Sequence, residues 1–100
     1  MGFKVVWTKQ ALDTFAKNIA YLQDKWSEKE INAFTSKVND ILSVIREHPS
    51  MYRKSEKLPN VHIGLIVKQV SLIYRVKPQK KEIELIAFLD NRQDPKKRQA

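Results

Sequence analysis

Two stretches in the first half of the chain carry apolar residues at helical spacing. In the first stretch these residues are Leu12, Phe15, Ile19, Leu22 and Trp26. In the second they are Ile31, Phe34, Val38, Ile41, Leu42 and Ile45. Positions three and four residues apart lie on one face of a helix, and the other face of the first stretch is polar, Asn18 included. The pattern therefore predicts two amphipathic helices.

Local signals place the ends of these helices. Thr8 offers a hydroxyl where the first helix begins, and Ser27 with Glu30 fits a capping box that starts the second. Pro49 cannot continue a helix, so the second helix is expected to stop near His48. The link between the helices is short, which favours an antiparallel helical hairpin.

Runs typical of strands surround the hairpin. A β-branched and aromatic run covers residues 3–7, and three further runs cover 61–67, 71–77 and 82–89. Only short turns separate the last three, so they predict an antiparallel meander. We therefore expect one α+β domain over residues 1–95, of order β-α-α-β-β-β, with the helical hairpin packed on a small antiparallel-meander sheet. Residues 96–100 are predicted to be a flexible basic tail.

Composition narrows the chemistry. The chain has 100 residues, no cysteine and only two glycines, which disfavours disulfides, thiolate metal sites and a glycine-rich phosphate loop. We expect no metal and no cofactor. No apolar run is long enough to span a bilayer, so a soluble, cytoplasmic protein without membrane contact is expected.

The net charge of +8 is concentrated in the second half. Up to His48 seven Lys and Arg face six Asp and Glu, a net charge of +1, whereas from Pro49 onward twelve face five, a net charge of +7. A field of one sign attracts polyanions, so nucleic acid or an acidic protein is the expected partner. The alternative is that the charge serves solubility alone.

The cations cluster at a few positions. Residues 49–60 are predicted to form a basic loop with Arg53, Lys54 and Lys57. Lys68 lies at the first turn of the predicted meander. Arg75 lies on the middle strand and Arg92 follows the last one. Such cations can stabilise a pentavalent phosphate during metal-independent RNA cleavage, or they can form a passive patch. Arg75 should have a partner or a ligand, because an arginine on a half-buried strand is costly to desolvate.

His62 is the one histidine near these cations. It can act as a general base on RNA, or it can be a half-exposed strand residue without chemistry.

Several strings, in their order and spacing, resemble the RelE/ParE superfamily of type II toxins. They are Trp7-Thr8 with Ala11, Glu47-His48-Pro49, Ile73-Tyr74-Arg75-Val76, Ile83-Glu84-Leu85-Ile86 and the ending Asp90-Asn91-Arg92-Gln93-Asp94-Pro95. The resemblance covers nearly the whole chain. It implies a toxin of the plasmid-stabilisation kind that inhibits growth and is neutralised by a cognate antitoxin, whose acidic or amphipathic segment wraps the toxin. It also implies that operator DNA is bound only through the antitoxin.

The superfamily contains gyrase inhibitors of the ParE kind and ribosome-dependent mRNA endonucleases of the RelE kind. By resemblance, Arg75 and Arg92 are the candidate catalytic cations of an endonuclease. Arg53, Lys54, Lys57, His62 and Lys68 are the candidate contacts to target or antitoxin. No Tyr or His follows Arg92, where nucleases often carry an acid or base, so the ending is more similar to the ParE side. A non-catalytic nucleic-acid-binding module is the alternative from another class.

Overall fold

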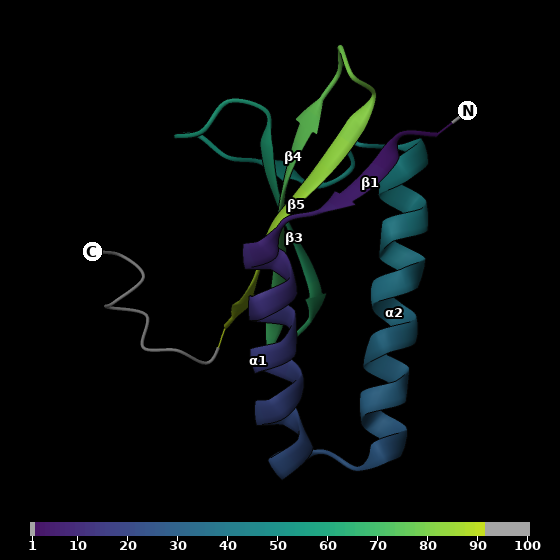
Figure 1. The fold of residues 1–100 in the computed structure, drawn as a ribbon, viewed down its shortest axis with the longest axis vertical. Helices are drawn as coiled ribbons and strands as arrows, with labels where there is room; N and C mark the ends of the chain where they lie inside the picture. Colours follow the sequence, from purple (N-terminus) through teal and green to yellow (C-terminus); the bar gives the residue numbers. More distant parts are fainter. Residues whose placement is uncertain (1, 92–100) are drawn as a thin grey trace.

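The computed structural model describes residues 2–91 and places two helices against one sheet (Figure 1). The elements follow in the order β1 (Lys4–Trp7), α1 (Lys9–Lys25), α2 (Glu28–Glu47), β2 (Arg53–Lys54), β3 (Val61–Val67), β4 (Val70–Lys77) and β5 (Glu82–Asp90). The α+β class and the helical hairpin are confirmed. The bounds of β3, β4 and β5 differ from the predicted runs by one residue at most.

Both helices begin at the residues that the sequence indicates. The Thr8 side chain accepts a hydrogen bond from the backbone N–H of Ala11 at the start of α1. At the start of α2, Ser27 and Glu30 form both hydrogen bonds of a capping box. The last turn of α2 closes on His48, directly before Pro49. The hairpin is therefore set by local chemistry at its ends.

The sheet has the order β1-β5-β4-β3-β2, and β3, β4 and β5 form the predicted antiparallel meander. Two features go beyond the prediction. The first strand joins the meander by pairing parallel to β5, which makes the sheet mixed. Residues Arg53–Lys54, expected in a loop, form a strand of two residues against β3. So short a pairing has no alternating pattern that a sequence can display.

The helices cover one face of the sheet, and the core lies between them (Figure 1). Its fully buried side chains include Leu22 from α1, Phe34 and Ile45 from α2, and Leu72 and Tyr74 from β4. In α1 the buried face differs from the predicted stripe. Leu12 is 54% exposed, whereas Ala11 and Asn18 are buried. The reason is the position of α1, which lies beside a strand edge.

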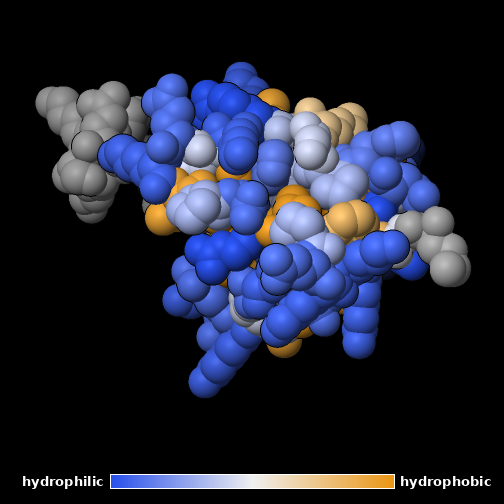
Figure 2. All heavy atoms as spheres, turned by 90° about the horizontal axis from the view of Figure 1, so that it is seen from above, coloured by the Kyte–Doolittle hydropathy of each residue, from blue (hydrophilic) through white to orange (hydrophobic). Residues whose placement is uncertain are grey.

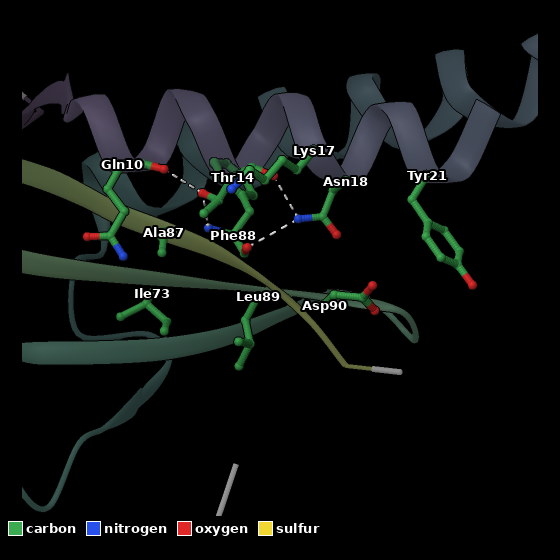
Figure 3. A pocket seen from close by; sticks show the side chains of 10 residues that line it. All are labelled: Gln10, Thr14, Lys17, Asn18, Tyr21, Ile73, Ala87, Phe88, Leu89 and Asp90. Carbon is green, nitrogen blue, oxygen red and sulfur yellow. Dashed lines mark hydrogen bonds between the residues drawn. The ribbon is translucent and has the colours of Figure 1, made fainter. Parts of the chain in front are cut away.

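This edge belongs to β5. β1 pairs with residues 82–85 of β5 and leaves the rest of that edge without a strand. Helix α1 bonds it instead, as the dashed lines of Figure 3 show in part. The Thr8 hydroxyl donates to the Leu85 carbonyl, the Phe88 N–H donates to the Thr14 hydroxyl, and Asn18 Nδ2 donates to the Phe88 carbonyl, at 2.7, 2.9 and 3.1 Å. Three side chains of one helix thus replace a neighbouring strand.

A second polar cluster lies at the C-terminal end of β5. The Asn91 N–H donates to the Gln69 carbonyl at 2.7 Å, and Asn91 Nδ2 donates to the Ser71 hydroxyl at 2.9 Å. These bonds join the end of β5 to the turn between β3 and β4.

The role of Thr14 can be tested by Thr14→Val, which keeps the shape of the side chain but leaves the buried Phe88 N–H without an acceptor. We expect a loss of about 1–3 kcal/mol in the free energy of unfolding, measured by urea denaturation. Thr35→Val is the matched control, because the Thr35 hydroxyl also bonds a carbonyl four residues earlier but is exposed and accepts nothing from a strand. Its effect should stay within about 0.5 kcal/mol. Equal losses would contradict the role assigned to α1.

Candidate functional site

The sheet face opposite the helices carries Arg75, which pairs with no acidic side chain among the residues that the structure describes. Arg75 lies directly across from Glu84 of β5 and Val61 of β3. Glu84 is paired with Lys77, whose Nζ lies 3.3 Å from the Glu84 carboxylate. Within residues 2–91, the buried Nε of Arg75 has no hydrogen-bond partner. Because a buried donor without a partner is costly, Arg75 favours an incoming carboxylate or phosphate.

Three of the predicted cations lie together beside this face. Arg53, Lys54 and Lys57 line a cavity of about 360 Å³, together with Ser55, Glu56 and Ile63. The Ser55 hydroxyl accepts from the backbone N–H groups of Lys57 and Leu58, both at 3.2 Å, which holds the loop in a turn. The loop returns to the sheet where the Ser55 N–H donates to the Val61 carbonyl. The cations are therefore displayed from a bonded turn next to β3.

The turn between β4 and β5 adds charge at the same end of the sheet. The Val76 N–H donates to the Asn60 carbonyl at 2.8 Å, so the basic loop reaches the strand that leads into this turn. The turn itself contains Lys80 and Lys81. Seen from this end, most visible side chains are hydrophilic, with small apolar areas between them (Figure 2). The sequence pattern predicts only a turn here, because the contact between Asn60 and Val76 depends on the tertiary fold.

One predicted site residue, Lys68, lies apart from this cluster. Lys68 is exposed at the turn between β3 and β4, at the other end of β3 and roughly 20 Å along the strand from the basic loop. Arg92 lies outside the described residues. The structure therefore brings Arg53, Lys54 and Lys57 together near Arg75 and leaves Lys68 elsewhere.

His62 is buried, so the expectation of a half-exposed histidine is wrong. Only 6% of the residue is exposed, and its ring stacks on that of Tyr74 with centroids 5.3 Å apart. Its Nδ1 lies 2.9 Å from the Tyr52 carbonyl, which can only accept, so Nδ1 carries the proton. The burial follows from the segment around Tyr52, which packs on β3 next to Gly64. A Cβ added at Gly64 would lie 2.6 Å from the Tyr52 ring.

Tyr74 is held in the same way. Its hydroxyl donates to the Pro49 carbonyl at 2.8 Å, and burial raises its pKa from 10.0 to about 12. His62 and Tyr74 thus fasten the segment from Pro49 to Tyr52 against the sheet, and neither ring is presented to the cations outside.

No group of three or more His, Asp or Glu side chains suited to a metal ion occurs among residues 2–91. Over the same residues, neither helix has the length and apolar character needed to cross a membrane.

Comparison with known proteins decides the family. Residues 5–95 match the family model described as the ParE toxin of the type II toxin–antitoxin system parDE. The chain belongs to the ParE toxin family. It is thus the toxin of a type II toxin–antitoxin system, as the sequence resemblance implied. No curated protein matches the chain in sequence.

Solved structures share the fold of this toxin at low sequence identity. A chain of the chromosomal ParDE system from P. aeruginosa has a TM-score of 0.68 at 17% identity, over 88% of the toxin and 95% of that chain. A chain of the RelBE2 toxin–antitoxin complex from Mycobacterium tuberculosis has a TM-score of 0.61 at 12% identity, over 91% and 100%. A free E. coli RelE mutant has a TM-score of 0.63 at 17% identity, over 92% and 86%. These likenesses show the fold alone.

Tyr74→Phe tests the attachment of the Pro49–Tyr52 segment. Loss of the bond to the Pro49 carbonyl should cost about 1 kcal/mol in the free energy of unfolding at pH 7. The variant should also respond differently to alkaline pH. In the unfolded toxin Tyr74 loses its proton near pH 10, but in the folded toxin only near pH 12, so stability falls as pH rises between these values.

Urea denaturation between pH 8 and pH 12 measures this slope. Tyr74→Phe should lack that part of the fall, whereas Tyr21→Phe, a change at a partly exposed tyrosine, should retain it. A slope unchanged in Tyr74→Phe would contradict the assignment.

Proposed function

We propose that this toxin stops growth by binding and inhibiting DNA gyrase, as a ParE-like inhibitor without catalysis of its own. The carrying observation is the state of His62 and Tyr74. Both side chains could move a proton, but within the described residues both are buried and bonded to backbone carbonyls. Cleavage of RNA by a side-chain acid and base needs such groups in reach of the phosphate. The match to the ParE family supports the same reading.

In this proposal the cation cluster binds a partner and does not catalyse a reaction. Arg53, Lys54 and Lys57 project from a turn, and Arg75 lies on the open face with a buried Nε that no group in residues 2–91 satisfies. An acidic segment of the cognate antitoxin can satisfy Arg75 with a carboxylate and cover the loop at the same time. We infer that neutralisation works by occupying this surface, and that operator DNA is contacted through the antitoxin.

The same set of assays distinguishes gyrase from the alternative target, ribosome-bound mRNA. Induced expression of the toxin should arrest growth, and co-expression of the neighbouring antitoxin gene should restore it. The purified toxin should inhibit supercoiling of relaxed plasmid by gyrase or trap cleaved DNA, while cellular mRNA mapped by primer extension stays intact. Codon-phased cuts in mRNA, with gyrase activity unchanged, would instead favour a RelE-like endonuclease.

The role of Arg75 in neutralisation is tested with Arg75→Gln, which keeps a polar side chain but removes the charge. A charge-assisted hydrogen bond contributes about 1.5–3 kcal/mol, so the affinity for the antitoxin, measured by calorimetry, should fall about 10- to 100-fold. Lys29→Gln removes one positive charge from the exposed start of α2 and should change the affinity less than about 2-fold. An affinity equally insensitive to both changes would remove Arg75 from the interface.

A further inference from the structure

A cavity of about 410 Å³ lies between α1 and the last residues of β5 (Figure 3). Its size is in the range of pockets that bind small organic groups. Its apolar wall includes Ile73 of β4 and Ala87 and Leu89 of β5. On the side of α1, Lys17 and Asn18 are among the lining residues. The cavity therefore combines an apolar wall with a few polar groups.

Asn18 leaves an acceptor unused in this cavity. The residue is 5% exposed, and its Nδ2 donates to the carbonyls of Thr14 and Phe88 at 2.9 and 3.1 Å. Because both partners are carbonyls, which only accept, the orientation of the amide is fixed. Within residues 2–91, its buried Oδ1 has no hydrogen-bond partner. A buried acceptor of this kind is rare in folded proteins and requires an explanation.

The direction and the burial of this oxygen define what a ligand must supply. In Figure 3 Asn18 Oδ1 points away from α1, toward the last residues of β5. Because the oxygen is already shielded from water, a donor that reaches it gains a hydrogen bond without breaking one between Oδ1 and solvent. A ligand that suits the site therefore carries one N–H or O–H donor on a mostly apolar group.

The charge at the rim of the cavity narrows the choice of ligand. Lys17 is exposed there and carries a positive charge. It repels the charged groups of lysine and arginine, but it is attracted to the face of an aromatic ring. Among amino-acid side chains, the indole of tryptophan combines a large apolar surface with a single N–H donor and no acceptor.

We propose that this cavity binds the side chain of a tryptophan from a partner polypeptide. The indole ring lies on Ile73, Ala87 and Leu89, and its N–H donates to Asn18 Oδ1. The Lys17 ammonium lies over the outer face of the ring. A buried aromatic anchor of this kind supplies a large share of the affinity of many protein interfaces. The inference does not depend on which target the toxin inhibits.

The test uses the full-length ¹⁵N-labelled toxin and N-acetyl-tryptophan amide as the probe. Binding is followed by NMR through the side-chain amide of Asn18 and the backbone amides of Ala87 and Leu89. These signals should shift in a saturable way, while signals of the basic loop at 53–57 stay in place.

Three further probes separate the contributions to binding. The 1-methylindole analogue of the same probe keeps the ring but lacks the N–H, and it should bind about 2- to 10-fold more weakly. N-acetyl-phenylalanine amide, which also lacks a donor and has a smaller ring, should bind more weakly than N-acetyl-tryptophan amide. N-acetyl-arginine amide should leave the signals of Asn18, Ala87 and Leu89 unshifted, because Lys17 repels its charge.

Two variants with matched controls locate the site. Ala87→Leu fills the apolar wall and should abolish the shift of the Asn18 amide, whereas Ala33→Leu adds the same volume at an exposed position of α2 and should leave the dissociation constant unchanged. Lys17→Gln should weaken binding about 2- to 5-fold, and Lys29→Gln, at the exposed start of α2, should have no effect.

The 1-methylindole probe is applied to the unaltered toxin, so the test stays decisive if Ala87→Leu does not fold. The absence of a saturable shift, equal binding of the 1-methylindole and indole probes, or tighter binding of the arginine probe would each overturn the proposal.

Discussion

The structure depends on how one strand edge is satisfied. β5 lies inside the sheet, but β1 covers only its first half, and a bare edge in the second half would be open to water and to other strands. Thr8, Thr14 and Asn18 of α1 bond that half through their side chains. This arrangement fixes the position of α1 on the sheet, which in turn orients the helical hairpin and closes the core on one face only. The open face, with Arg75, is the other result of the same constraint.

The two faces of the sheet have different roles. The covered face is an apolar core into which the rings of His62 and Tyr74 also point, so these residues act as attachments for the Pro49–Tyr52 segment. The open face carries Arg75, whose buried Nε has no hydrogen-bond partner within residues 2–91, and the adjoining loop carries Arg53, Lys54 and Lys57. A surface of this kind suits recognition of an acidic partner and supplies few of the groups that proton transfer requires.

Local signals made the fold predictable. The hydroxyls of Thr8 and Ser27 and the ring of Pro49 act within a few residues of their own position, so the sequence alone places the helix ends correctly. Features that depend on distant contacts were missed or misplaced. Asn18 has the position of a solvent-facing residue in the helical pattern and is buried only because β5 lies against that side of α1.

In the candidate site too, the features that depend on neighbouring residues were predictable and those that depend on distant contacts were not. The cations Arg53, Lys54 and Lys57 are close in sequence, and their grouping was predicted, whereas the addition of Lys80 and Lys81 depends on the contact between Asn60 and Val76. The burial of His62 depends on Tyr52, ten residues away, and no periodic pattern reports it. The unsatisfied Nε of Arg75 agrees with the argument that an arginine on this strand needs a partner or a ligand.

The pairing of β1 with β5 also bears on the order in which the fold forms. The Thr8 hydroxyl bonds a carbonyl 77 residues later, and β5, the last strand in the described part of the chain, lies between β1 and the rest of the sheet. Contacts so distant in sequence form late, because the intervening chain must first be available. An incomplete nascent chain therefore lacks the finished sheet and, with it, the open face. The open face therefore forms only once β5 has been synthesised and has paired with both β1 and β4.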